Sequence, residues 1–222
     1  IQKEKVKDFW IKGDTAAEYI GRVIEYIAVK EVSDIMDYND VNKYVEKVIE
    51  SNSFLVDNII PDFITASDLK YLLTCLVREK VSVKNIVYIF EKINDYANEP
   101  TKEDLLDKVR LALSRHIVKD LAKDGELKVI EFSDEILDRV YSFFKEDEEE
   151  AIIRIDSCEV QDIASRLMKI AKAKKITSPV IAVPMDIRHM VFVILSEFVQ
   201  DLTVLAHEEL VSDYNIKFIG KI

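Results

Sequence analysis

Three amphipathic helical patterns between Asp68 and Ile117 constrain the fold of this chain more than any other feature. In each pattern apolar residues recur at three- and four-residue spacing, so a helix would carry them on one face. These residues are Leu69, Leu72, Leu73, Leu76 and Val77 in the first pattern, Ile86, Ile89, Phe90 and Ile93 in the second, and Leu105, Leu106, Val109 and Leu113 in the third. Ser67 and Asp68 would cap the first helix, and Pro100 separates the second from the third. Because the breaks are short, the three faces have one another to bury against, which predicts a compact helical unit.

Two further helices are expected upstream. Asp14 or Thr15 would cap a long helix, and a second would follow Asn39 and Asp40. The stripe of the long helix consists of Ala17, Ile20, Ile24, Ile27, Ala28 and Ile35. An apolar connector from 54 to 63, interrupted by Pro61, would lie over the core.

Downstream of residue 120 short strands alternate with helices, after a turn at Asp124 and Gly125. The expected strands are 127–132, 152–155, 180–183, 203–206 and 216–219, and the expected helices begin at Ser133, at Asp156 or Ser157, and at Asp186. Strands that alternate with helices imply a small sheet covered by helices. The predicted class is α+β, a mainly helical block with a three-helix unit and a short strand, followed by a small α/β subdomain. The predicted divisions are 1–66, 67–150 and 151–222.

The formal net charge of −11 excludes a large phosphate-binding surface, which needs an excess of lysine and arginine. Nucleic acid is therefore not an expected partner. The acidic run at 146–150 is interpreted as a solvated linker between subdomains.

No apolar run approaches the roughly 20 residues that cross a bilayer. Because the chain starts with Ile1 rather than Met, we expect it to be a piece of a longer protein.

No constellation of residues specifies an active site. The histidines, His116, His189 and His207, have no second histidine or cysteine at metal-ligand spacing. The 4 glycines are too scattered for a phosphate-binding loop. Cys75 and Cys158 have apolar neighbours and fit burial in a reducing compartment better than a disulfide or a metal site. The sequence predicts no enzyme, no metal and no cofactor.

Two stretches resemble the cytoplasmic domain of the large export-gate subunit of bacterial type III secretion, the family shared by flagellar exporters and virulence injectisomes. The first stretch matches at Leu73, Leu76, Glu79, Val81, Ser82, Val83, Lys84 and Asn85, at 89–91, and at Val109, Arg110, Leu113, Arg115 and Ile117. The second matches at 186–188, 201–205, Glu209, Leu210 and 215–222. Several residue types recur at fixed spacing and in the right order, so chance similarity is a poor explanation.

The resemblance implies a ring-forming protein that receives cargo. A nine-membered ring below the export channel would dock secretion chaperones with cargo, gatekeeper proteins and stalk proteins of the ATPase complex. Only the missing N-terminal half would enter the bacterial inner membrane, with this domain in the cytoplasm. Arg110 and Arg115, read as lying beside the apolar face of their helix, would pair with acid across the ring contact. Arg22 stands near the place where flagellar relatives have a threonine that lines a cargo pocket.

Alternative functions fit the sequence less well. The ending at 215–222 resembles injectisome members more closely than flagellar ones, and a flagellar export gate is the alternative within the family. A trihelical unit followed by a strand could also be a winged-helix DNA-binding protein. Its second helix offers Lys84, Asn85 and Lys92 but no arginine for base edges, and the net charge opposes it.

Overall fold

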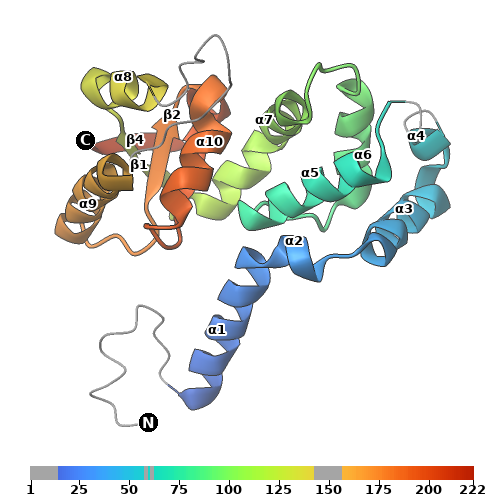
Figure 1. Cartoon of the computed structure of the whole chain (residues 1–222), viewed down its shortest axis with the longest axis horizontal. Coiled ribbons are helices and arrows are strands. Elements are labelled where there is room, and N and C mark those ends of the chain that lie inside the picture. Colours follow the sequence, from blue (N-terminus) through green and yellow to red (C-terminus); the bar gives the residue numbers. More distant parts are fainter. Residues whose placement is uncertain (1–14, 58–59, 61–62, 143–156) are drawn as a thin grey trace. The chain divides into compact units, whose positions relative to one another are not determined.

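The computed structural model describes residues 15–57, 60, 63–142 and 157–222, which belong to two compact units, 1–102 and 103–222. Figure 1 shows the helices and strands of the chain, coloured along the sequence. The acidic run at 146–150 and the predicted strand at 152–155 lie outside the described residues.

The first unit is helical. Its helices are α1 (Ala16–Lys30), α2 (Val32–Ile35), α3 (Tyr38–Asn52), α4 (Phe54–Asp57), α5 (Ala66–Arg78) and α6 (Ile86–Asp95). The predicted apolar faces of α5 and α6 are confirmed, because Leu72, Leu76, Ile89 and Phe90 are among their fully buried side chains. Helix α3 packs against α5 and α6 and contributes Val41 and Val48 to the core.

Capping boxes start three of these helices. The reciprocal pairs of side-chain and backbone hydrogen bonds join Thr15 to Glu18 in α1, Asp37 to Asp40 in α3 and Thr65 to Asp68 in α5. The predicted cap of α5 was wrong by two residues: Asp68 is the third helical residue and accepts the Thr65 N–H at 3.1 Å. The hydroxyl of Thr65 also donates to this carboxylate and lowers the pKa of Asp68.

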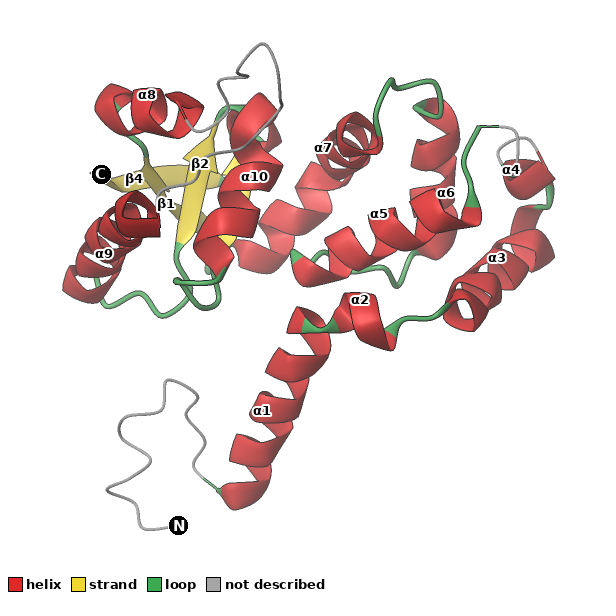
Figure 2. Cartoon of the chain, viewed as in Figure 1, coloured by secondary structure: helices red, strands yellow, loops and turns green. Residues whose placement is uncertain are grey.

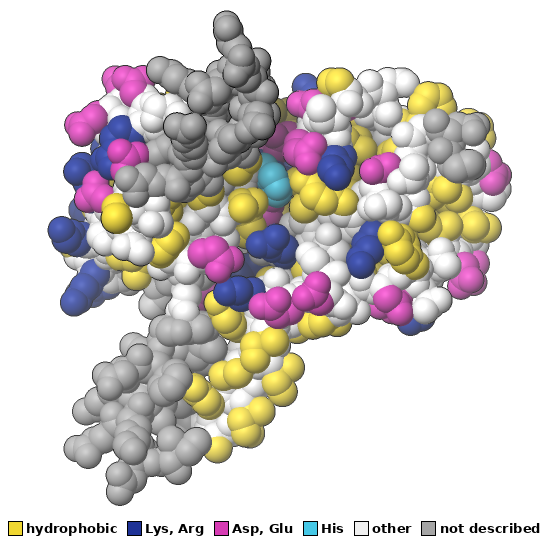
Figure 3. Space-filling model, viewed as in Figure 1, with side chains coloured by type: hydrophobic (Ala, Val, Ile, Leu, Met, Phe, Trp, Pro, Cys, Tyr) yellow, Lys and Arg dark blue, Asp and Glu magenta, His cyan; other side chains and the backbone are white. Residues whose placement is uncertain are grey.

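Helix α1 has no buried residue, although its predicted stripe is present. Ile20, Ile24 and Ile27 are each about half exposed or more, at 56%, 61% and 49%. Figure 3 shows hydrophobic side chains along this helix. The period of the stripe predicted the helix correctly, although Ile35 lies in α2, and the isoleucines of α1 are largely exposed.

The second unit combines helices with a parallel sheet (Figure 2). Its elements are α7 (Lys102–Leu121), β1 (Glu126–Glu131), α8 (Asp134–Ser142), α9 (Ser157–Ala173), β2 (Val180–Val183), α10 (Met185–Ser196), β3 (Thr203–Ala206), the 3₁₀ turn η1 (His207–Glu209) and β4 (Asn215–Lys221). Within the described residues the strand order is β3-β2-β1-β4, and all neighbours are parallel.

One buried cluster joins the sheet to α8, α9 and α10. It includes Ile136 and Val140 of α8, Ile163 and Leu167 of α9, Val191 and Leu195 of α10, and Ile181, Val183 and Val204 of the strands. A register shift between Val129 and Ile130 marks a bulge where β1 meets β4. Close packing continues beyond the bulge, where Gly220 of β4 lies against Ile170 of α9.

The predicted α+β class is confirmed, but the elements group differently from the expected three-part division. Strand β1, expected within 67–150, pairs with β2 and β4. Helix α7, expected beside α5 and α6, belongs almost wholly to the second unit. The partners of a strand can lie far along the chain, so local patterns do not reveal them. Strand β1 therefore belongs to a parallel sheet and not to the hairpin of a winged helix.

Gly220→Ala should destabilise the protein by about 1–3 kcal/mol because the added Cβ would overpack a filled site. The Cβ would lie 2.9 Å from Ile170 Cγ2, on a branched side chain that cannot move easily. Urea unfolding measures the change. Gly21→Ala is the matched control: its Cβ meets nothing within 4 Å and should stabilise α1 by up to about 1 kcal/mol. Equal effects at both positions would contradict tight packing at Gly220.

Candidate functional site: interaction surfaces

A buried ion pair connects α7 to the end of β3. Arg110 and Glu209 are each 1% exposed, and Arg110 Nε lies 3.0 Å from Glu209 Oε1. Arg110 Nη2 also donates to Glu209 Oε2 at 3.2 Å and to the carbonyl oxygen of Val204 at 3.4 Å. The same Glu209 oxygen accepts the Ala206 N–H at 2.8 Å. Two charges taken out of water are thus compensated by each other and by backbone groups.

A second arginine ties α7 to α10. The side chain of Arg188 is 1% exposed, and its Nε and Nη2 lie 2.8 and 2.6 Å from Asp107 Oδ1. Charge-assisted pairs of this length are among the stronger polar contacts in proteins. Helix α7 is therefore held within the second unit at two points, by Arg110 and by Asp107.

The structure separates the two arginines that the sequence assigned to a ring contact. Arg110 does not lie beside the apolar face but within it, three or four residues from the buried Leu106, Leu113 and Ser114. Its acid partner is Glu209 of the same chain, so the expected pairing of Arg110 across subunits was wrong. Arg115 is exposed at 76% of its side chain and lies 3.3 Å from Asp213 Oδ2.

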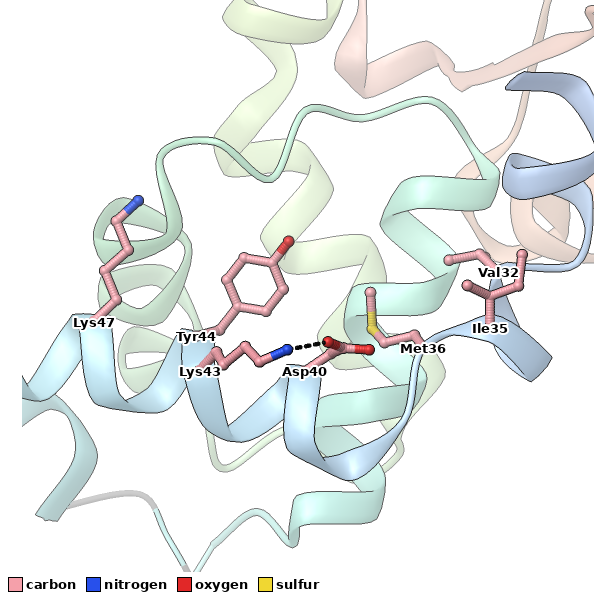
Figure 4. A pocket seen from close by; sticks show the side chains of 7 residues that line it. All are labelled: Val32, Ile35, Met36, Asp40, Lys43, Tyr44 and Lys47. Atoms are coloured by element: carbon pink, nitrogen blue, oxygen red, sulfur yellow. Dashed lines mark hydrogen bonds and ion pairs between the residues drawn. The ribbon is translucent and has the colours of Figure 1, made fainter. Parts of the chain in front are cut away.

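A groove of about 390 Å³ lies along α2 and α3 in the first unit. Val32, Ile35 and Met36 line its apolar end, and Asp40, Lys43, Tyr44 and Lys47 follow along α3 (Figure 4). Lys43 Nζ lies 2.9 Å from Asp40 Oδ1. This hydrogen bond is the largest cause that lowers the pKa of Asp40 and raises the pKa of Lys43. The arrangement suits a peptide with apolar and polar faces better than it suits catalysis.

Arg22, the predicted remnant of a cargo pocket, is exposed on α1 and does not line this groove. No group of three or more histidine, cysteine, aspartate or glutamate residues within the described ranges could hold a metal ion. In the same ranges, no helix combines the length and the apolar character needed to cross a membrane.

Comparison of the sequence with known protein families identifies the family of this chain. The model of the FHIPEP family matches residues 2–215. The chain belongs to the FHIPEP family. The flagellar biosynthesis protein FlhA of Bacillus subtilis is 28% identical over 200 residues, which cover 84% of this chain and 28% of FlhA. Protein MxiA of Shigella flexneri is 25% identical over 210 residues, 91% of this chain and 29% of MxiA. The chain thus spans less than a third of these FHIPEP relatives.

Several solved structures have the same fold. The Shigella flexneri MxiA structure matches with a TM-score of 0.82 and 22% identity, covering 94% of this chain and 66% of that one. Nonameric EPEC SctV-C matches with a TM-score of 0.79 and 20% identity over 94% and 64% of the two chains. A complex of the Chlamydia pneumoniae proteins CdsV and CdsO matches with a TM-score of 0.76 and 21% identity over 99% and 66%.

The stretches that resemble this family contain three of the four residues of the two buried pairs, but their contacts were not predicted from the sequence. Arg110, Arg188 and Glu209 lie in the matched motifs, and Asp107 precedes Arg110 by one helical turn. One signal was available: Arg110 falls at helical spacing within the apolar pattern of α7, and a charge at such a position needs a buried partner. The identity of that partner, 99 residues away, was not available.

Arg110→Leu should destabilise the second unit by about 3–5 kcal/mol because it leaves Glu209 buried and unpaired. The double variant Arg110→Leu/Glu209→Leu should lose less than the single variant, since no charge is then left alone. Urea unfolding of the single and double variants measures this coupling. Arg115→Leu, on the exposed side of α7, is the control and should change stability by less than about 1 kcal/mol. Additive losses at Arg110 and Glu209 would contradict the buried pair.

Proposed function

We propose that this chain is part of the cytoplasmic ring of a type III protein export gate, where it docks chaperone–cargo complexes and passes cargo to the inner-membrane channel. The observation that carries this proposal is the FHIPEP match over residues 2–215, together with the fold shared with MxiA and SctV-C. In this role the chain works through surfaces rather than through an active site. The domain lies in the cytoplasm, and the remainder of the protein anchors it in the bacterial inner membrane.

Assembly into a homononameric ring is supported by the nonameric state of the related SctV-C. Arg115 is the residue proposed for the ring contact. Its guanidinium is exposed, and its 3.3 Å contact with the half-exposed Asp213 is weak enough to be exchanged for an acid on a neighbouring copy. Closed rings need head-to-tail contacts between different surfaces, so a cation on α7 would meet a different element of the next copy.

Partner binding is proposed for the first unit. The groove along α2 and α3 combines an apolar end with Lys43 and Lys47, which suits amphipathic segments of chaperones, cargo or a gatekeeper. Arg22 on the exposed helix α1 is proposed as a further contact for the same partners. Stalk proteins of the ATPase complex are proposed as further partners. That the related CdsV was solved in complex with a second protein, CdsO, supports binding of a partner protein.

We propose a virulence injectisome rather than a flagellum as the host machine, on the basis of the injectisome-like ending at 215–222. The flagellar alternative is favoured by one observation, the 28% identity with the flagellar FlhA of Bacillus subtilis.

Affinity capture with this chain should retain injectisome chaperones in preference to flagellar ones. Retention of flagellar chaperones alone would reverse this assignment.

Light scattering across a wide concentration range tests the ring. The molar mass should rise toward a closed oligomer, and Arg115→Glu should suppress this rise by placing an acid against the acid of the neighbouring copy. Lys119→Glu reverses an exposed charge on the same helix and serves as the matched control, with assembly unchanged. A chain that stays monomeric at every concentration would contradict self-assembly, and equal assembly of both variants would remove Arg115 from the contact.

A further inference from the structure

The two edges of the sheet in the second unit differ. All four residues of β3 are buried. Thr203 donates its N–H toward β2, at Pro179, so by alternation Val204 and Ala206 face away from β2. Those outward groups are the ones that bind Arg110 and Glu209, because the Val204 carbonyl accepts from Arg110 and the Ala206 N–H donates to Glu209. The buried ion pair therefore closes the β3 edge.

Strand β4 forms the opposite edge and pairs with β1 alone among the described elements. It runs over 7 residues, Asn215–Lys221, of which Phe218 is 51% exposed. The Asn215 N–H donates to Gly125 of the β1 side. Backbone groups alternate along a strand, so those of Ile216 and Phe218 point away from β1. An edge of this length is a template for an additional strand.

The surface beside this edge is basic in an acidic protein. Neither 163–185 nor 215–222 contains an aspartate or glutamate, although the chain has a net charge of −11. Their basic residues are Arg166, Lys169, Lys172, Lys174, Lys175, Lys217 and Lys221. The contact between Gly220 and Ile170 places α9 beside β4. Side chains alternate along a strand, so Lys217 lies on the same face of the sheet as Gly220 and Lys221 on the other, on either side of the β4 edge. We name α9 and the β4 edge with these basic residues the α9–β4 surface. In Figure 3 dark blue side chains lie at the end of the unit that contains α9, with magenta ones among them.

The lysines of β4 form only weak ion pairs with neighbouring acidic residues. Lys217 Nζ lies 3.7 Å from Glu126 and Lys221 Nζ lies 3.9 Å from Asp134, and both lysine side chains are more than half exposed. Exposed pairs of this kind contribute little free energy and leave their cations available to a partner. Lysines on an edge strand also oppose pairing between identical chains, which directs the edge toward a partner of opposite charge.

We propose that the α9–β4 surface binds an extended acidic segment of a partner protein, which adds to the sheet as a strand beside β4. Backbone hydrogen bonds to the β4 edge would supply affinity, and acidic side chains facing the lysines would supply selectivity. Nucleic acid fits less well, since phosphates do not match the strand's alternating N–H and C=O groups and the rest of the chain repels them. The proposal goes beyond the ring function and needs no assembled ring.

The test uses a short fluorescent peptide in which glutamate alternates with valine. Fluorescence anisotropy at low salt should detect binding, and Lys217→Glu/Lys221→Glu should weaken it about tenfold. Lys84→Glu/Lys119→Glu carries the same charge change at exposed positions that belong to neither α9 nor β4 and should leave affinity within about twofold. Hydrogen exchange should slow at the amides of Ile216 and Phe218 when the peptide is bound.

Peptide controls separate strand addition from charge attraction. A peptide N-methylated at alternate residues keeps its charges but loses donors along one edge, so its binding should be lost. Retained binding would overturn strand addition. The proposal would also be overturned if the parent peptide failed to bind, or if the two double variants weakened peptide binding equally. Stronger binding of single-stranded RNA or of anionic vesicles than of the peptide would overturn it as well. Lys217→Gln/Lys221→Gln provides a milder second variant if charge reversal disturbs folding.

Discussion

The buried pair between Arg110 and Glu209 is the interaction on which the second unit depends. Taking two charges out of water is unfavourable, and the structure compensates by giving Glu209 the guanidinium and a backbone N–H at once. The same contacts fix η1 against the end of β3 and supply a donor to the Val204 carbonyl. With Asp107 and Arg188 as a second tie, α7 becomes an integral layer of the α/β unit, although in sequence it follows directly on the helices of the first unit.

This arrangement determines which surfaces remain for partners. Because Arg110 is used inside the chain, the exposed face of α7 presents Arg115 and not a pair of arginines. Because the ion pair closes the β3 edge, the free edge of the sheet in the described part of the chain is β4, where lysines gather. In the first unit the exposed surfaces include the isoleucines of α1 and the groove along α2 and α3.

The sequence predicted the positions of helices and strands better than it predicted which of them contact one another. Strands 180–183 and 203–206 were placed at their observed bounds, because short apolar runs between turn residues are local signals. The start of α5 was misplaced since several neighbouring residues could cap it, and only geometry selects Thr65. Arg110 was misjudged because its acid partner lies 99 residues away in the sequence. The pairing of β1 with β2 and β4 was not predicted because parallel pairing is non-local. The family motifs identified the protein class without revealing that their charged residues hold the fold together.

The central claim is that α7 folds as part of the α/β unit through its buried arginine contacts. Native-state hydrogen exchange of the unmodified protein in increasing denaturant tests it most directly, because residues of one cooperative unit share an opening free energy. The account predicts that amides in the middle of α7, such as Leu113, open together with those of β2 and β3 and separately from α5 and α6. Opening of α7 together with α5 and α6, while the sheet stays protected, would contradict it.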